Sequence, residues 1–273
     1  MIIISYLCGR NMNYTLNVHG QLLDLSRPLV MGILNATPDS FFADSRRQTE
    51  EEIAACSRKM LAEGAAIIDV GGCSTRPGGE VATEAEEMKR LRTALTVIRG
   101  ELPAAVLSID TFRPDVARMA VEEFGADIIN DVSGGTPEMF RMVTRLHIPY
   151  ILMSLQPTIR EMLLSFAEKV QQLRDMGAND IILDPGFGFG KTLEQNYEVM
   201  NELEKLLVME LPLLVGVSRK SMIYRSFDCT PQEALNGTTA LNTIALMKGA
   251  SILRVHDVKE AMECVKIVGQ LNG

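Results

Sequence analysis

At residues 181–191 the chain reads IILDPGFGFGK, a short apolar run followed by an acid, a proline and three alternating glycines. The run at 181–183 is typical of a fully buried strand, and Asp184 falls at its carboxyl end. Pro185 has no N–H to offer a sheet, so we expect the strand to stop there. The glycines accept positive φ angles and allow backbone to approach a ligand closely. The segment therefore predicts a strand that delivers an acid to a glycine-rich loop.

Two phosphate-binding motifs do not fit this loop. A P-loop needs four residues between its first glycine and its GK pair, but only three separate Gly186 from Gly190, and Pro185 takes the place of the required glycine. The dinucleotide fingerprint needs GxGxxG, and this loop reads GxGxG. On this stretch alone, a tight loop whose phenylalanines complete the core remains an alternative to a ligand site.

Length and charge narrow the class of protein. The 273 residues are 47% apolar and 23% charged, which suits one barrel domain or two smaller domains. The net charge of −8 argues against general nucleic-acid binding, so a local group of cations must hold any anionic ligand. The five cysteines lack metal-type spacing, which favours reduced thiols in the cytoplasm. No apolar run approaches the ~18 residues of a membrane span, and we expect residues 1–11 to be a dispensable extension.

Short apolar runs recur along the chain, and each is followed by a polar loop and a helix-like segment. The runs lie at residues 29–34, 66–70, 105–109, 127–129, 150–153, 181–183, 213–217 and 251–255. This alternation of buried strands and helices predicts an α/β fold, a single (β/α)8 TIM barrel over residues 28–273. A doubly wound open sheet is the alternative. Residues 1–27 should form a short N-terminal extension, with a possible hairpin over residues 14–24.

Helix-capping residues mark the segments between the strands. Thr49 and Thr83 each open a Thr-x-x-Glu capping box, and Pro114 and Pro137 suit the first turn of a helix. Thr230 precedes a proline at the start of another helix. From these signals we expect helices near residues 50–64, 84–100, 160–176, 231–249 and 258–271.

Polar residues follow the strands at the ends where (β/α)8 barrels carry their chemistry. Asp110, Asn130 and Asp184 follow the third, fourth and sixth runs, and Lys220 follows the seventh. A carboxylate accepts hydrogen bonds from a ring N–H and a neighbouring amine, and an amide offers both a donor and an acceptor. Together with a cation, these groups suit a flat aminopyrimidinone such as a pterin or guanine. Each acid could instead cap the next helix.

A second group of residues suits an anion. Arg254 ends the last strand, and His256 lies two residues on, beside a helix N-terminus. Arg76 lies in a glycine-flanked loop that could swing over the anion, or it is a solvated surface arginine. Asn35 offers an amide oxygen to Mg²⁺, with phosphates and waters completing the shell. The sequence shows no Ser-His-Asp or Cys-His pattern.

Seven segments resemble the dihydropteroate synthase family, in the family's order and spacing from about residue 28 to residue 269. They are residues 31–41 (MGILNATPDSF), 69–72 with 74–78 (DVGG and STRPG), 109–111 (IDT), 129–131 (IND), 183–191 (LDPGFGFGK), 218–221 (SRKS) and 254–257 (RVHD). Any one of these segments is weak, but seven in register are specific.

The resemblance implies a transferase of folate biosynthesis that works in the cytoplasm. It would condense (7,8-dihydropterin-6-yl)methyl diphosphate with 4-aminobenzoate to give 7,8-dihydropteroate and pyrophosphate. It further implies Mg²⁺ as cofactor, a homodimer formed through the late helices, and a target of sulfonamides. No nucleic acid or membrane partner is expected.

The same resemblance assigns residues by their place in the motifs. The implied pterin contacts are Asp110, Asn130, Asp184 and Lys220. The implied Mg²⁺ ligand is Asn35, and the implied diphosphate site is Arg254 with His256. The aminobenzoate surroundings would be Pro77, Phe189, Lys220 and Ser221. Thr75, Arg76 and residues 37–45 would form loops that close over the site. The residues acting on the reaction itself would be Arg76, Lys220, Arg254 and His256.

Three positions depart from the family's pattern, and other functions remain open. Ala43-Asp44-Ser45 stand where a glycine pair is usual, Cys73 where glutamate is frequent, and Ser154 where histidine is frequent. A methyltetrahydrofolate-dependent corrinoid methyltransferase shares the barrel but needs no diphosphate site. A pterin-binding paralogue without catalysis stays open because of the change at residues 43–45. A phosphate-binding isomerase would need a catalytic base that the sequence does not offer.

Overall fold

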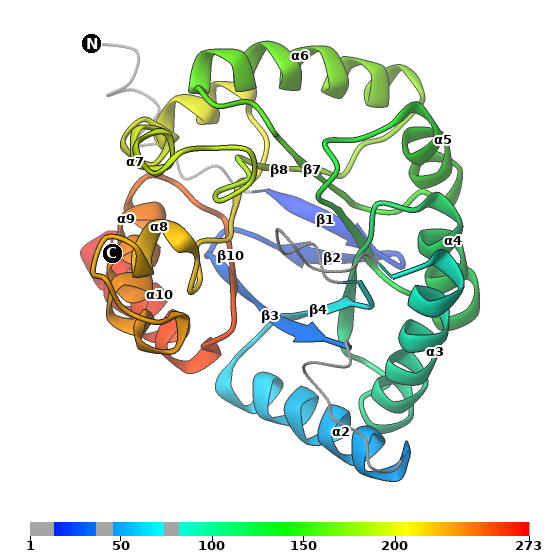
Figure 1. Cartoon of the computed structure of the whole chain (residues 1–273). Helices are drawn as coiled ribbons and strands as arrows, with labels where there is room; N and C mark the ends of the chain where they lie inside the picture. The colour runs from blue at the N-terminus through cyan, green and yellow to red at the C-terminus, as the bar shows by residue number, and fades with distance from the viewer. Residues whose placement is uncertain (1–13, 37–45, 74–81, 273) are drawn as a thin grey trace.

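Eight parallel strands form a ring in the computed structural model, which describes residues 14–36, 46–73 and 82–272 (Figure 1). The strands are β3 (Leu29–Asn35), β4 (Ile67–Gly71), β5 (Val106–Asp110), β6 (Ile128–Asp131), β7 (Tyr150–Met153), β8 (Ile181–Asp184), β9 (Leu214–Val215) and β10 (Ile252–Val255). Their spatial order is β8-β7-β6-β5-β4-β3-β10-β9. The parallel bridge between Leu183 and Leu213 brings β8 to the start of β9. This near-closed ring confirms the predicted barrel and rules out the open sheet.

The strands agree with the apolar runs in the sequence except at β9. The sequence predicts a strand over residues 213–217, but the structure has only Leu214–Val215. Gly216 lies against Arg254, whose Cβ would be 3.7 Å from a side chain at that position. The chain leaves the sheet early here, because it turns into the loop that carries Ser218 and Lys220.

Helices cover the outside of the ring (Figure 1). They are α2 (Arg46–Glu63), α3 (Glu84–Glu101), α4 (Pro114–Phe124), α5 (Pro137–Leu146), α6 (Ile159–Asp175), α7 (Leu193–Asn201), α8 (Ser221–Tyr224), α9 (Leu235–Met247) and α10 (Val258–Asn272), with 3₁₀ turns η1 (Leu203–Met209) and η2 (Pro231–Glu233). In the described residues no helix is long and apolar enough to cross a membrane.

The capping signals are confirmed in most places and wrong in one. Thr83 caps α3 in a full capping box, and Pro114 and Pro137 open α4 and α5. Thr230 caps the short turn η2 instead of opening α9 directly. Thr49 is not a cap, because α2 already begins at Arg46 and Thr49 lies inside it.

The apolar core has two parts. The larger one lies between the strands and the outer helices. The smaller one fills the amino-terminal end of the barrel, where Met31, Ile151 and Ile252 meet residues of an N-terminal hairpin.

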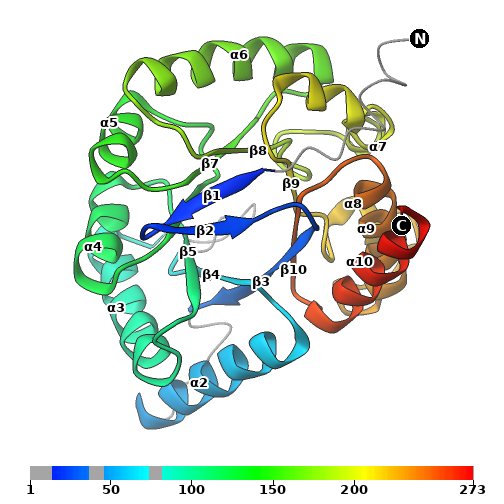
Figure 2. The same ribbon diagram turned by 180° about the vertical axis from the view of Figure 1, so that it is seen from behind.

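That hairpin confirms the prediction for residues 14–24. Strands β1 (Thr15–Val18) and β2 (Gln21–Asp24) pair antiparallel and lie across the middle of the ring in Figure 2. Leu16 and Val18 face the core, so the hairpin closes the amino-terminal end. The opposite, carboxyl-terminal end is left for the functional residues.

Candidate active site

Arg254 occupies the centre of the carboxyl-terminal end of the barrel. Its Nε donates to Asp69 Oδ2 and its Nη2 donates to Asp110 Oδ2, each over 2.6 Å. Burial acts to lower the pKa of Arg254, but the two carboxylates outweigh burial and raise that pKa, so the guanidinium stays charged. The sequence groups Arg254 with the anion site; the structure places it equally among the residues expected to hold the pterin.

Asp69 is a site residue that the sequence analysis gives no role. It lies within β4 with a fully buried side chain, and its Oδ2 also accepts a hydrogen bond from Asn130 Nδ2 at 3.2 Å. The available signal was an acid inside the apolar run at residues 67–70, because a carboxylate is rarely buried without a partner. The partner, Arg254, lies 185 residues further along the chain.

Three buried oxygen atoms near this end have no hydrogen-bond partner among the described residues: Asp69 Oδ1, Ser108 Oγ and Asn130 Oδ1. A buried polar atom left unpaired costs free energy, so such atoms point to a ligand or water. Because Asn130 directs its amide N–H toward a carboxylate, its oxygen is left to accept a hydrogen bond. The sequence leads us to expect both a donor and an acceptor from this amide; in the structure one N–H is bound by Asp69 and the oxygen remains an acceptor.

Asp110 and Asp184 carry the two acids expected at the pterin. Burial raises the pKa of Asp110 to about 7, although Arg254 acts to lower it. Burial also raises the pKa of Asp184, against Lys220 and the N–H of Gly186. Asp184 Oδ1 accepts that N–H at 2.7 Å, so Asp184 shapes the following loop besides facing the site.

Lys220 reaches across the mouth from the loop after β9 to the loop after β8. Its Nζ donates to the carbonyl of Phe187 at 2.6 Å and lies 4.7 Å from the centre of the Phe189 ring. Burial lowers the pKa of Lys220 to about 8, with Asp184 opposing the shift. Ser221 follows directly as the first residue of α8. The structure therefore places Lys220 beside both Asp184 and Phe189.

The glycine-rich loop is folded back on itself. Gly186, Gly188 and Gly190 all have positive φ, between +63° and +80°. Lys191 holds the loop, since its Nζ donates to the carbonyls of Ser154, Gly186 and Phe189. Phe187 is buried in the core, whereas Phe189 is half-buried. Phe187 therefore completes the core, as the alternative interpretation of this stretch expects, whereas Phe189 contacts Lys220.

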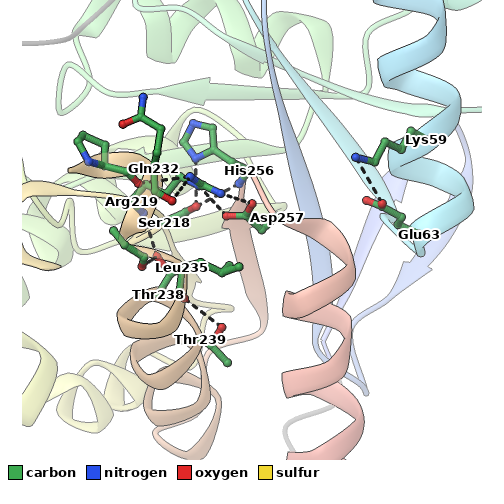
Figure 3. Close-up of polar contacts among 12 residues, drawn as sticks. Lys59, Glu63, Ser218, Arg219, Gln232, Leu235, Thr238, Thr239, His256 and Asp257 are labelled. Atoms are coloured by element: carbon green, nitrogen blue, oxygen red, sulfur yellow. Dashed lines mark hydrogen bonds and ion pairs between the residues drawn. The ribbon is translucent and has the colours of Figure 1, made fainter. Parts of the chain in front are cut away.

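Asn35 and His256 flank this cluster. A side chain at Gly71 would lie 3.8 Å from Asn35 Oδ1 and 3.6 Å from Asp110 Cβ, so the glycine keeps the space between them open. His256 is exposed, and its Nδ1 lies 3.0 Å from Ser218 Oγ, as Figure 3 shows. Arg219 forms two hydrogen bonds with Asp257 beside it.

Several predicted residues lie outside the described part of the chain. These are Thr75, Arg76 and Pro77, together with residues 37–45, which include Ala43-Asp44-Ser45. The other two departures from the family pattern are buried: Cys73, and Ser154, whose carbonyl accepts a hydrogen bond from Lys191.

Within residues 14–36, 46–73 and 82–272, Asn35 fits the role of a single protein ligand to Mg²⁺. In the described residues no group of three His, Cys, Asp or Glu could hold a metal ion. The Asn35 amide oxygen, facing the open space at Gly71, is a hard ligand of the kind that Mg²⁺ accepts together with phosphate and water. Asn35 can therefore serve such an ion only when a phosphorylated ligand shares it.

Comparison with known proteins now identifies the family. Residues 31–256 match the model of the pterin binding enzymes. The dihydropteroate synthase of Escherichia coli is 38% identical over 265 residues, covering 91% of this chain and 93% of that protein. The chain belongs to the dihydropteroate synthase family. Relatives of this kind favour the synthase over the corrinoid methyltransferase that shares its barrel.

Two solved structures of the family share the fold. The Xanthomonas albilineans dihydropteroate synthase with 4-aminobenzoic acid has a TM-score of 0.88 and 34% identity, covering 96% of this chain and 99% of that one. The Yersinia pestis dihydropteroate synthase in a sulfonamide drug complex has a TM-score of 0.85 and 37% identity, covering 94% and 99%. The likeness spans the whole barrel, including the strand ends that carry the site.

Proposed function

We infer that the chain is a dihydropteroate synthase, a transferase that joins (7,8-dihydropterin-6-yl)methyl diphosphate to 4-aminobenzoate and releases pyrophosphate. The observation that carries this inference is the cluster in which Arg254 binds Asp69 and Asp110 beside Asn130. It combines a permanent cation with hydrogen-bonding groups that suit a flat aminopyrimidinone ring.

The pterin ring is held by the acids and the amide of the mouth. Asp184 accepts from a ring N–H and the exocyclic amine, while the unpaired oxygen of Asn130 accepts a further N–H. Lys220 donates to a ring acceptor, moving from the Phe187 carbonyl that it now contacts. Asp110 completes the set and keeps Arg254 in place.

The reaction needs charge stabilisation more than a base. Positive charge develops on the methylene as the diphosphate leaves, and the conjugated ring can delocalise that charge, so the C–O bond can break ahead of attack. The aniline nitrogen is neutral near pH 7 and attacks the methylene, after which it loses a proton to solvent. Arg254, His256 and Arg76 stabilise the departing diphosphate, and orientation of two flat substrates supplies much of the remaining acceleration.

Mg²⁺ is proposed as the cofactor, with Asn35 as its protein ligand. When bound, the ion supplies positive charge to the diphosphate oxygens. Asn35, the last residue of β3, would be the protein ligand that holds the ion.

The aminobenzoate is proposed to lie on Phe189, between Lys220 and Ser221, with Thr75 and Pro77 closing over it. The cation–π contact of Lys220 with Phe189 presents a flat apolar face beside a positive charge, which suits a benzoate. A sulfonamide has the same aniline end, so we also propose that sulfonamides compete at this place. The reaction is placed in the cytoplasm, in line with the free thiols of Cys56, Cys73, Cys229 and Cys264.

A homodimer through α9 and α10 is proposed from their exposed apolar residues. These helices pack side by side (Figure 1), and Ile244, Met247, Ile267 and Leu271 are 39–70% exposed. A contiguous exposed apolar surface is typical of an interface, and two adjacent helices that each carry exposed apolar residues are candidates for one.

We also propose that residues 28–273 form the catalytic barrel and that residues 1–11 are dispensable. The hairpin, by contrast, buries Leu16 and Leu25 against the barrel. Deleting residues 1–11 should leave folding and turnover unchanged, and a loss of either would contradict the proposal.

The deciding experiment is pyrophosphate release from the pterin diphosphate with Mg²⁺, with and without 4-aminobenzoate. Release that requires aminobenzoate and yields dihydropteroate supports the synthase. Tight binding of the pterin diphosphate without product would instead support the non-catalytic paralogue. No binding would contradict the pterin assignment of Asp110, Asn130 and Asp184.

A further inference from the structure

Ser218 and His256 meet where the last two strands of the barrel end (Figure 3). Ser218 Oγ lies 3.0 Å from His256 Nδ1, and the backbone N–H of His256 donates to the same oxygen over 3.2 Å. Ser218 is only 4% exposed, so water has little access to its hydroxyl. No role follows for Ser218 from the sequence or from the proposed reaction.

The donors and acceptors at Ser218 favour one of the two positions for the ring proton of His256. A backbone N–H can only donate, so it occupies one lone pair of Ser218 Oγ. If Nδ1–H also donated to this oxygen, the hydroxyl proton would be buried without an acceptor among the described residues. An unsatisfied buried donor is unfavourable, because its lost hydrogen bond to water is not replaced. The favoured arrangement therefore has Ser218 donating to Nδ1, with the ring proton on Nε2.

A second pair of residues keeps this contact in register. Arg219 Nε and Nη2 donate to the two oxygens of Asp257 at 2.8 and 2.7 Å (Figure 3). The backbone N–H of Arg219 donates to Thr238 Oγ1 at 3.1 Å, which ties the same turn to α9. Two consecutive residues after β9 thus pair with two consecutive residues after β10: Ser218 with His256, and Arg219 with Asp257. The contact between Ser218 and His256 is therefore one of several hydrogen bonds that connect the segments following β9 and β10.

We propose that Ser218 is a positioning residue that fixes His256 as the neutral tautomer protonated on Nε2. Nε2–H then donates a hydrogen bond to the departing diphosphate, and the proton stays on the ring throughout. This inference rests on the proposed function. In this proposal His256 donates one directed hydrogen bond to the diphosphate, whereas Arg254 supplies a permanent positive charge.

The tautomer can be read directly by ¹⁵N NMR of the imidazole rings, because the chain has only three histidines. His19→Gln and His147→Gln variants assign the signals of His256. At a pH where the ring is neutral, we expect an unprotonated Nδ1 and a protonated Nε2 in the substrate-free protein. Inorganic pyrophosphate with Mg²⁺ should then shift the Nε2 signal and leave Nδ1 unprotonated.

Variants separate positioning from general loss of structure. In Ser218→Ala the two nitrogen signals should move toward each other, as the two tautomers mix, and kcat should fall about tenfold with little change in KM, the effect of one lost hydrogen bond. Thr144→Ala, which removes a hydroxyl that donates to the Phe140 carbonyl on α5, is the matched control and should change neither.

A wild-type ring protonated on Nδ1 would overturn the proposal, and so would unchanged signals and turnover in Ser218→Ala. The wild-type spectrum decides the tautomer even if the alanine variant fails to fold. Because the spectrum is recorded without substrate, its outcome is independent of the pyrophosphate-release assay. Failure of the synthase assignment is therefore distinguishable from failure of the role given to Ser218.

Discussion

Asp69 balances the charge of Arg254 and orients the amide of Asn130. Asp69→Asn removes that negative charge. The new amide also carries N–H donors, whereas both of its neighbours, Arg254 and Asn130, need an acceptor. Breaking a buried ion pair costs about 3–5 kcal/mol, and because Asp110 still binds Arg254, we expect the free energy of unfolding to fall by about 3 kcal/mol in a denaturant titration.

The matched control is Asp115→Asn. Asp115 pairs with Arg118 at 2.9 Å, but both side chains are about half exposed, 60% and 47%. Exposed pairs contribute less than about 1 kcal/mol, so this variant should change the free energy of unfolding little. An equal decrease in the free energy of unfolding of the two variants would show that burial does not increase the contribution of the Asp69–Arg254 pair to stability.

In the proposed function, the one carboxylate of Asp184 both accepts the N–H of Gly186 and binds the pterin. In Asp184→Asn the remaining oxygen can still accept the N–H of Gly186, but the bidentate, charged contact with the ring is lost. Hydrogen bonds to a charged group contribute about 1.5–3 kcal/mol, so pterin should bind roughly 100-fold more weakly in calorimetry. Unchanged affinity would remove Asp184 from the pterin site.

Deprotonation of Lys220 should cause activity to fall at alkaline pH, the alkaline limb of the pH profile. Its pKa is lowered to about 8 by burial, so it loses its charge as the pH rises through that value. We expect kcat/KM for the pterin diphosphate to fall above pH 8. In Lys220→Arg the cation persists because a guanidinium does not titrate there, and the limb should disappear from the pH profile even if overall activity is lower. The same limb in both proteins would assign it to another group.

At the scale of elements, the loop after β8 depends on Gly186. Its φ is +67°, and a Cβ at this position would lie 2.3 Å from the carbonyl oxygen of Ser154. The left-handed conformation alone costs a non-glycine residue about 1–2 kcal/mol, so Gly186→Ala should lower the free energy of unfolding by at least about 2 kcal/mol and weaken pterin binding.

Gly100→Ala offers the control for this loop. Gly100 lies in α3 with no neighbour within 4 Å of a built Cβ, and alanine favours helix over glycine by about 1 kcal/mol. It should leave stability equal or higher in the same titration. A stable Gly186→Ala protein with unchanged binding would mean that the loop can refold around the added methyl group.

The sequence predicts the strands well because they are buried on both faces, and because polar residues or proline mark where they end. The run at residues 181–184 illustrates this, since an apolar strand, Asp184 and Pro185 fall where the structure has them. The start of α2 at Arg46 was not predictable from Thr49, because a capping box also occurs inside helices. The sequence does not reveal the roles of Asp69 and Ser218, because their partners, Arg254 and His256, are distant in sequence. Each pair forms only when the barrel closes.

At the scale of the whole molecule, α9 and α10 should join two copies of the chain. Ile267 is 61% exposed on α10, and Ile267→Glu places a charge in the proposed interface. We expect the wild-type protein to sediment as a dimer and this variant as a monomer at micromolar concentration. Leu164→Glu changes an equally exposed residue, 67%, on α6 and should remain dimeric. A monomeric wild type would contradict the interface.

The position of β10 between β3 and β9 has a consequence for synthesis on the ribosome. Asp69 and Asp110 are made 185 and 144 residues before the arginine that neutralises them. Until the end of the chain emerges, β3 has an open edge and the two acids lack the guanidinium of Arg254 that binds both of them. The nascent protein can therefore pair β3 with β10 only when it also completes this cluster of buried charges, because both contacts require the same short segment of chain.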